Sequence, residues 1–171
     1  KEVDIKKDET VYVNLDSKGE LIEVNVVNRI QTPNSGTYID YGSYEKITNL
    51  SKASKHKVEG DKIAWQLEGD SKGFYYQGKL KDAKVPFIFL VKYNVNGIDT
   101  PSKDMPGKRG KIKICIEAKP NMDADVHFRD KYFYQIQAEL NLDRCINVSA
   151  PGATSIISGR TQNLGFMLMP G

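Results

Sequence analysis

The 171 residues of this chain suffice for one sizeable hydrophobic core or two small ones. Charged residues make up 27% of the chain and hydrophobic residues 39%, with a formal net charge of +3. This balance points to no nucleic-acid partner and no acidic substrate. No apolar run approaches the roughly 20 residues of a membrane-spanning helix, so we expect no membrane insertion. The first residue is Lys and no signal peptide is visible, so we expect a trimmed product that has lost a leader or anchor.

The N-terminal part of the sequence predicts a β-hairpin followed by further short strands. Residues 1–9 are densely charged, and we expect them to be frayed or weakly paired. Residues 11–15 and 21–30 alternate between apolar and polar side chains on either side of a turn at 16–20, which is the pattern of a hairpin. Residues 37–50 are aromatic and β-prone.

The next segment predicts a polar loop and two strands. The lysine-rich residues 51–61 indicate a solvated loop, with a weak helical alternative at their start. Residues 62–70 predict a short strand that carries Trp65 on its apolar face, where the ring suits either a core anchor or a ligand platform. Residues 73–80 predict an aromatic strand interrupted by glycine.

The strongest pattern of the chain lies in residues 86–118. Residues 86–95 are apolar on both faces up to Lys92, so we expect this strand to be buried on both sides. Residues 111–118 alternate strictly, which predicts a strand whose isoleucine face packs on a core. The intervening residues 98–110 hold prolines, glycines and basic side chains, which indicates a long, rigid surface loop instead of a tight hairpin turn.

The C-terminal part continues as strands and loops. The segments that we expect are a polar loop at 119–130, strands at 131–140 and 143–152, a turn-rich segment at 153–163 and a last strand at 164–170. The chain thus predicts ten or eleven short strands and no convincing helix, which is typical of an all-β protein. We expect an N-terminal β-hairpin region in residues 1–70, packed on the rest or forming a small lobe. Residues 71–171 would form an immunoglobulin-like β-sandwich, with the boundary near Gly69–Gly73.

Two cysteines, Cys115 and Cys145, are too few for a disulfide scaffold. If both lie on the polar side of neighbouring strands, a disulfide between them is one alternative, and two unrelated thiols are the other. The sequence contains no Cys-x-x-Cys motif and no Cys/His spacing typical of a zinc site.

Several segments resemble, in order, one family of exported domains. They are the hairpin at 11–28, residues 40–50, Phe-Tyr-Tyr-Gln-Gly at 74–78, residues 85–97, the segment 105–117 with its Gly-Lys-x-Gly loop, and residues 134–140. Together they resemble the extracytoplasmic β-rich region of uncharacterised Gram-positive (Firmicutes-type) surface or membrane proteins, some of them phage-infection-protein-like. The resemblance implies an extracytoplasmic, cell-surface or secreted location and a membrane-anchored parent. It carries no catalytic residues.

The sequence gives little support to an enzyme or a metal site. It has two histidines and no Gly-x-Ser-x-Gly motif, so a hydrolase is disfavoured. Asn121, Asp123 and Asp125 have the oxygen spacing that begins a calcium loop, but Val126 and Tyr132 replace the glycine and glutamate that an EF-hand needs. A looser calcium site at these three residues is the weaker alternative to a solvated turn. We expect no cofactor and no resident metal.

The remaining hint is binding through aromatic or basic side chains. Tyr75 and Tyr76, together with Trp65, could form a binding patch, although burial within the domain is the preferred interpretation. Lys108 and Arg109 lie in the long loop, which suits surface recognition. We therefore expect a non-catalytic surface module for adhesion, envelope interaction or assembly, with a cell-envelope component or another protein as partner. A carbohydrate-binding or glycan-processing domain is the alternative.

Overall fold

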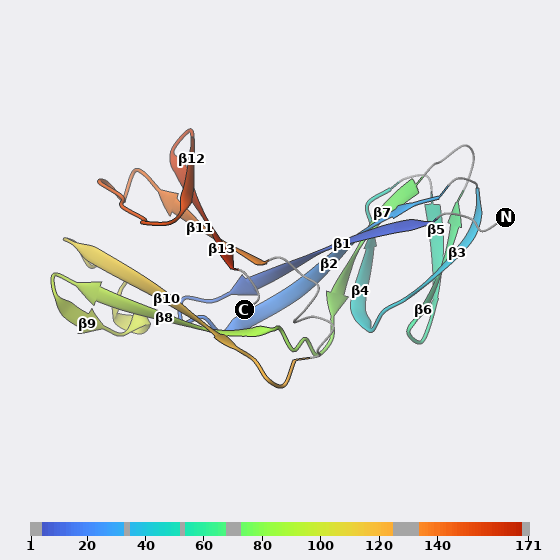
Figure 1. The fold of residues 1–171 in the computed structure, drawn as a ribbon, viewed down its shortest axis with the longest axis horizontal. Coiled ribbons are helices and arrows are strands. Elements are labelled where there is room, and N and C mark those ends of the chain that lie inside the picture. Colours follow the sequence, from blue (N-terminus) through green and yellow to red (C-terminus); the bar gives the residue numbers. More distant parts are fainter. Residues whose placement is uncertain (1–4, 33–34, 52–53, 68–72, 125–133, 169–171) are drawn as a thin grey trace. The chain divides into compact units, whose positions relative to one another are not determined.

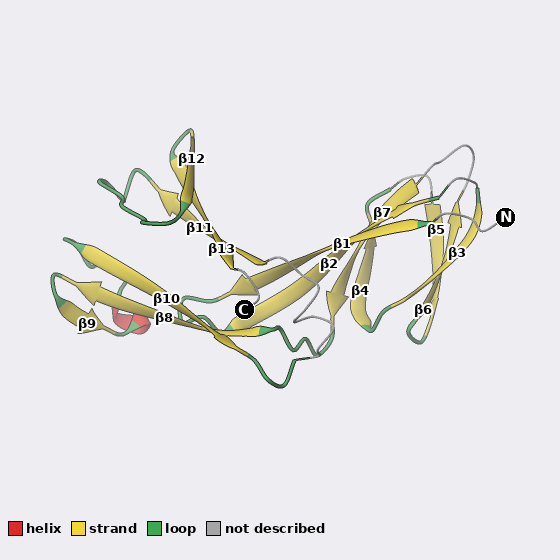
Figure 2. Ribbon diagram, viewed as in Figure 1, coloured by secondary structure: helices red, strands yellow, loops and turns green. Residues whose placement is uncertain are grey.

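The computed structural model describes residues 5–32, 35–51, 54–67, 73–124 and 134–168 (Figure 1). In these residues the chain is built from β-strands, with one short 3-10 turn as the helical element (Figure 2). The elements are β1 (Lys6–Leu15), β2 (Leu21–Gln31), β3 (Gly36–Tyr41), β4 (Tyr44–Asn49), β5 (Ser54–Glu59), β6 (Lys62–Leu67), β7 (Gly73–Leu80), β8 (Phe87–Val95), β9 (Ile98–Thr100), η1 (Ser102–Asp104), β10 (Ile112–Pro120), β11 (Tyr134–Asn141), β12 (Thr154–Ser158) and β13 (Thr161–Leu168). All observed strand pairs are antiparallel. The all-β prediction is confirmed.

The chain divides into two compact units, Lys1–Asn121 and Met122–Gly171. The first unit contains sheet A (β1-β2-β7-β4), sheet B (β3-β6-β5) and sheet C (β10-β8-β9), and the second contains sheet D (β11-β13-β12). Strand β7 pairs with β2 and β4, so it completes the N-terminal sheet. The division into these two units falls after Asn121, and a domain boundary near Gly69–Gly73 stays a prediction.

Sheets A and B share one aromatic core. Trp65 of β6 packs between two rings of β7, with centroid distances of 4.9 Å to Phe74 and 4.7 Å to Tyr76. All three side chains are fully buried, as are Ile30 and Ile63. Burial of aromatic side chains of this size, together with their tilted ring contacts, is the main stabilising contribution of this part of the chain.

A polar chain crosses the same core. Tyr76 Oη donates to Asp40 Oδ2 at 2.7 Å, and Lys7 Nζ donates to Asp40 Oδ1 at 2.9 Å. Burial, followed by the hydrogen bond to Asp40, raises the pKa of Tyr76 far above its ordinary value, so the phenol stays protonated and remains a donor. Next to Tyr76, Asn28 Nδ2 donates to Tyr44 Oη at 3.2 Å. These contacts give the Asp40 carboxylate and the Tyr76 hydroxyl hydrogen-bond partners, whereas Asn28 Oδ1 and Trp65 Nε1 are buried without one.

The β1–β2 turn contacts sheet C. Asp16 Oδ1 accepts hydrogen bonds from the backbone N–H groups of Lys18 and Glu20, and these bonds hold the pKa of Asp16 below its ordinary value. The carbonyl of Lys18 accepts a hydrogen bond from Val91 N–H at 3.0 Å, and the carbonyl of Ser17 accepts one from Tyr93 Oη at 2.7 Å. The hairpin is therefore tied to strand β8 at its tip.

Three local expectations were wrong. Residues 51–61 contain strand β5, which pairs with β6 along its whole length, where we expected a solvated loop. Residues 143–152 contain no strand, since Asn141 to Arg144 form a turn after β11, and the next strand is β12. At the N-terminus, Lys6 to Glu9 pair with β2 in an unbroken register, where we expected residues that are frayed or weakly paired. Strands β1 and β5 each pair with the strand that follows them in the chain, and this pairing stabilises charged segments that local periodicity did not identify as strands.

Candidate functional site

The site with the clearest functional character is the hairpin of sheet C, residues 86–120. Strand β8 pairs with β10 from Phe87↔Pro120 to Val95↔Ile112 without a break. On its other side β8 pairs with the short strand β9. Asn96 and Gly97 connect β8 to β9 with φ angles of 52° and 89°. Two positive φ angles at Asn-Gly are typical of a type I′ turn, so the segment begins with a tight hairpin turn that the sequence analysis did not predict.

Asn96 also closes the long loop between β9 and β10. Its side-chain Oδ1 accepts a hydrogen bond from Lys111 N–H at 2.8 Å, and its Nδ2 donates to the Arg109 carbonyl at 3.3 Å. The backbone N–H of Asn96 donates to the carbonyl of Lys111 at 2.8 Å. A Cβ atom at Gly110 would collide with the Asn96 side chain, and Gly110 has a φ of +115°. One asparagine thus fixes the C-terminal end of the loop, at Arg109 and Lys111, to the β8–β9 turn.

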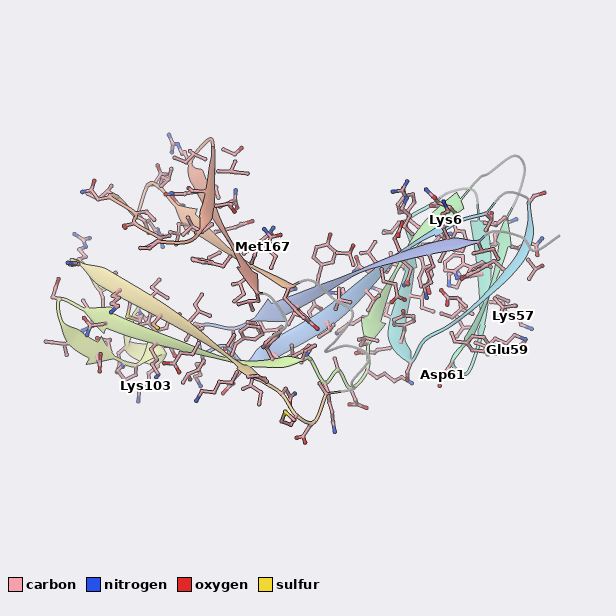
Figure 3. The ribbon with its side chains drawn as sticks, in the orientation of Figure 1. Lys6, Lys57, Glu59, Asp61, Lys103 and Met167 are labelled. Carbon is pink, nitrogen blue, oxygen red and sulfur yellow. The ribbon has the colours of Figure 1, made fainter. Side chains whose placement is uncertain are left out.

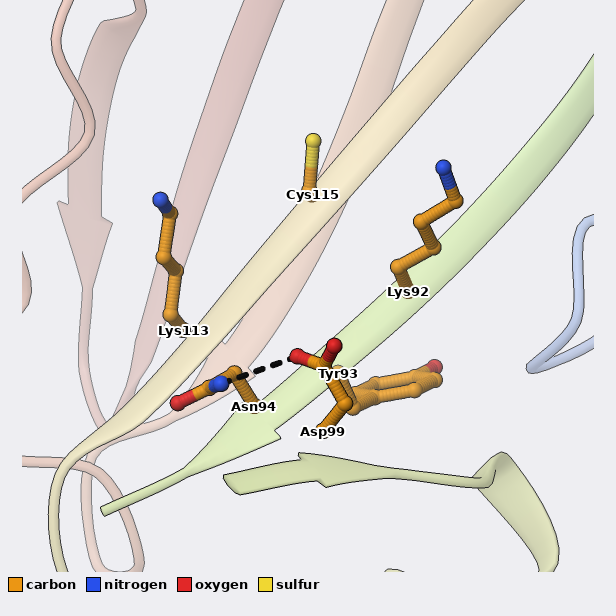
Figure 4. Close-up of a pocket in the computed structure, with 6 residues that line it drawn as sticks. All are labelled: Lys92, Tyr93, Asn94, Asp99, Lys113 and Cys115. Atoms are coloured by element: carbon orange, nitrogen blue, oxygen red, sulfur yellow. Dashed lines mark hydrogen bonds between the residues drawn. The ribbon is translucent and has the colours of Figure 1, made fainter. Parts of the chain in front are cut away.

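A shallow pocket of about 160 Å³ lies on one face of this sheet (Figure 4). It is lined by Lys92, Tyr93, Asn94, Asp99, Lys113 and Cys115. Lys92 is directly opposite Cys115 in the strand register, and Lys113 is opposite Asn94. Asn94 Nδ2 donates to Asp99 Oδ1 at 2.9 Å, which fixes both side chains at the edge of the pocket.

One lysine of the pocket is neutralised by a neighbour. Lys92 Nζ lies 2.7 Å from Glu117 Oε1. The hydrogen bond from Lys92 lowers the pKa of Glu117, and the same bond raises the pKa of Lys92. Both groups therefore remain charged over the whole neutral range. Because the pair is exposed, it contributes little to stability.

The other basic residues of the hairpin have no such partner. Between Pro86 and Pro120 there are seven basic and three acidic residues, an excess larger than the net charge of +3 of the whole chain. Within the described residues, six of these cations are exposed and make no ion pair: Lys103, Lys108, Arg109, Lys111, Lys113 and Lys119. Figure 3 labels Lys103, which projects from the η1 turn of the loop. The hairpin presents a cationic surface that would attract anions from solution.

The apolar side chains of sheet C are more exposed than we expected. Ile88 is 58% exposed and Leu90 is 42% exposed, so β8 is not buried on both sides. Ile112 and Ile114 of β10 are also exposed, at 42% and 49%. The prediction that the isoleucine face of β10 packs on a core is therefore wrong for these two residues.

The aromatic candidates lie elsewhere. Trp65 and Tyr76 are fully buried in the core of sheets A and B, so neither offers a surface to a ligand. Tyr75 points to the other side of β7 and is 42% exposed. Its ring lies 5.7 Å from the Arg29 guanidinium, in a cation–π contact on the outer face of sheet A. The three rings therefore form no common platform, because alternation along β7 separates Tyr75 from Tyr76.

The calcium candidates are only partly described. Asn121 Nδ2 donates to the Val85 carbonyl at 2.9 Å, and Asn121 N–H donates to the Pro86 carbonyl at 2.7 Å, so this residue ties the end of β10 to the start of β8. Asp123 is exposed, and Asp125 lies outside the described residues. In the part of the chain that the structure describes, no group of three or more His, Cys, Asp or Glu residues could hold a metal ion.

The two cysteines are not cross-strand neighbours. Cys115 lies in β10 opposite Lys92, whereas Cys145 follows the turn after β11 in the second unit. Both are free thiols in the structure. A disulfide between them and two unrelated thiols stay the two alternatives that the sequence leaves open.

Comparison with known proteins gives no relative from which a function could be transferred. No family model, no curated protein and no solved structure matches the chain. Across the described residues, no helix has both the length and the apolar character needed to cross a membrane. Any functional conclusion therefore depends on the residues themselves.

Proposed function

We propose that this chain is a non-catalytic extracytoplasmic module of a bacterial surface or membrane-anchored protein, and that it binds an anionic component of the cell envelope through the β8–β10 hairpin. The observation that carries the proposal is the set of six exposed, unpaired cations on one hairpin. Long-range attraction by such a cluster increases the rate of encounter with a polyanion and needs no deep pocket. The resemblance to exported Gram-positive domains supports the location.

The structure of the loop favours recognition over catalysis. Asn96 holds the C-terminal end of the loop, so Lys108 and Arg109 are displayed from a defined backbone, which lowers the entropy lost on binding. The shallow pocket between β8, β9 and β10 adds Lys113 to this surface. An immunoglobulin-like arrangement of residues 71–171 stays a prediction, and the proposal does not depend on it.

The carbohydrate-binding alternative has weaker support. It relied on Trp65 and the tyrosines as a stacking platform, but Trp65 and Tyr76 are buried. Binding of a neutral glycan is therefore the outcome that would contradict the proposal.

The test is binding of the full chain to immobilised polyphosphate, with dextran as a neutral polymer. A variant that combines Lys108→Glu, Arg109→Glu and Lys113→Glu should lose about tenfold or more in affinity for polyphosphate. The matched control combines Lys46→Glu, Lys62→Glu and Lys81→Glu, which are exposed residues outside the hairpin. It changes the net charge equally but should bind like the parent chain to within about twofold.

Equal losses in the two variants would show that only net charge matters and would overturn the assignment to the hairpin. Binding to dextran but not to polyphosphate would overturn the proposal in favour of the glycan alternative. Affinity for polyphosphate should also decrease with added salt, because exposed charges are screened within about 10 Å at 0.1 M ionic strength.

A further inference from the structure

Strand β12 differs from the other edge strands of this protein. In the described residues, the edge strands are β1 and β4 in sheet A, β3 and β5 in sheet B, β10 and β9 in sheet C, and β11 and β12 in sheet D. Each of these edge strands except β12 carries at least one charged residue. Charges on edge strands oppose pairing with another chain. Strand β12, with the sequence Thr-Ser-Ile-Ile-Ser, has neither charge nor proline to prevent it.

Both faces of β12 expose a large apolar side chain. Ile156 is 68% exposed and Ile157 is 64% exposed, although one lies on each face of the sheet. All five residues of the strand are exposed. An isolated three-stranded sheet buries little surface at such an edge, and a further strand would cover both isoleucines at once.

The backbone of β12 determines which groups are available at its outer edge. Gly159 and Arg160 form a two-residue connection to β13, with Ser158 opposite Thr161 and a φ of +58° at Gly159. In such a hairpin the flanking pair is hydrogen-bonded, and hydrogen-bonded pairs then alternate along the ladder. Ser158, Ile156 and Thr154 therefore direct their backbone groups toward β13. Ser155 and Ile157 direct their N–H and C=O groups outward.

We propose that the outer edge of β12 pairs with β12 of a second copy of this chain, antiparallel about a two-fold axis at Ile156. In this register Ser155 of each copy lies opposite Ile157 of the other, which joins the outward groups of both strands in four backbone hydrogen bonds. Ile156 lies opposite its own equivalent at a non-hydrogen-bonded position, where facing side chains are closest. Two copies of sheet D then form one continuous six-stranded sheet.

A second copy fits this edge because the strand is complementary to itself. A two-fold axis perpendicular to the sheet keeps equal residues on equal faces, so Ile156 must meet an isoleucine and never a charge. All five residues from Thr154 to Ser158 find a partner in this register, with Thr154 opposite Ser158. The proposal concerns sheet D alone and does not rest on anion binding by the β8–β10 hairpin.

The first test is the oligomeric state of the full chain by sedimentation equilibrium up to about 1 mM, since an interface of one strand pair is small and its affinity modest. We expect a reversible dimer. Ile156→Lys should weaken the dimer at least about tenfold, because it places two like charges directly opposite each other. Ile146→Lys is the control, since Ile146 is 82% exposed in the same unit but lies outside the strands, and it should dimerise like the parent chain.

A parent chain that is monomeric at all concentrations would overturn the proposal, as would a dimer unaffected by Ile156→Lys. Unfolding of the Ile156→Lys variant is checked by circular dichroism.

The second test reports the register without depending on the stability of that variant. In a Cys115→Ser, Cys145→Ser background, Ile156→Cys should form an intermolecular disulfide under mild oxidation, because facing residues of an antiparallel pair lie within disulfide range. Ile146→Cys should not. Equal cross-linking of both variants would contradict the proposed register.

Discussion

The hydroxyl of Tyr76 donates a hydrogen bond of 2.7 Å to Asp40 across the core between sheets A and B. The two residues are 36 positions apart in the sequence, and Asp40 is only 7% exposed. Lys7 Nζ lies 2.9 Å from the other carboxylate oxygen of Asp40. The N-terminal strand is thereby fixed to sheet B by a charged contact as well as by its pairing with β2.

Removing the carboxylate should destabilise the first unit. Asp40→Asn should lower the free energy of unfolding by about 2–4 kcal/mol, since it leaves Lys7 partly buried beside a neutral partner. Tyr76→Phe should cost about 1–3 kcal/mol, because it deletes one donor and leaves the ring packing intact. Urea denaturation measures both values. The double variant should lose less free energy of unfolding than the sum of the two single losses, by at least about 0.5 kcal/mol. A loss equal to that sum would contradict a direct contact between the two residues.

Lys7 should give the stability a characteristic dependence on alkaline pH. Burial alone would lower the pKa of Lys7, but hydrogen bonds and charge interactions with Glu9 and Asp40 outweigh it and raise the pKa above the ordinary value of 10.5. A raised pKa in the folded state means that the contribution is complete below pH 10.5 and is lost as the pH rises toward the folded-state value.

The measurement is the difference in free energy of unfolding between the parent chain and Lys7→Met. This difference should be constant from about pH 7 to pH 9.5 and should shrink above about pH 10.5. Lys57→Met is the control, because Lys57 lies 2.7 Å from Glu59 but its side chain is 78% exposed (Figure 3). The control difference should stay near zero at every pH. A Lys7→Met difference that grows with pH would contradict the assignment.

Asn96 should protect the basic loop from proteolysis. Asn96→Ala removes the hydrogen bonds to Lys111 N–H and to the Arg109 carbonyl, so the loop should open more often. Trypsin, which cuts after Lys and Arg, should then cleave at Lys103, Lys108 or Arg109 about tenfold faster in limited proteolysis. Asn94→Ala is the matched control, since Asn94 contacts Asp99 and not the loop ends. Equal cleavage of the two variants would exclude the proposed role of Asn96.

Gly19 should be essential for the contact between the β1–β2 turn and β8. A Cβ atom at Gly19 would lie 2.6 Å from the Phe89 carbonyl oxygen, and the residue has a φ of +92°. Gly107 has a similar φ of +79°, but a Cβ atom there would meet nothing within 4 Å. Gly19→Ala should therefore destabilise the chain by about 1–3 kcal/mol more than Gly107→Ala, because only the first adds a collision to the backbone strain.

Hydrogen exchange identifies where the Gly19→Ala variant is perturbed. The Val91 amide, which donates to the Lys18 carbonyl, should lose protection, while the Ile30 amide in the interior of sheet A should not. Unchanged protection at Val91 would show that the turn tolerates the methyl group.

The cationic hairpin was only partly predictable. Alternation in residues 111–118 placed Lys111, Lys113 and Cys115 on one face, and the strand register confirms this for Lys113 and Cys115. The partners of Asn96 could not be inferred, because they depend on how a loop of more than ten residues closes on itself. The pocket residues Lys92, Asn94 and Asp99 were not predicted either. Their proximity to Lys113 follows from the strand register, which the local pattern does not contain.

Local sequence patterns account for the conformation of most strands. The apolar–polar period of two in residues 21–30 and 111–118 specified strands, because each residue's own side chain decides which face suits it. Which strands share a sheet depends on the tertiary structure. The pairing of β7 with β2 and the contact of Lys7 with Asp40 join segments that are distant in sequence. Their association is governed by shared burial and by the entropy of closing long loops, neither of which is encoded in a local pattern.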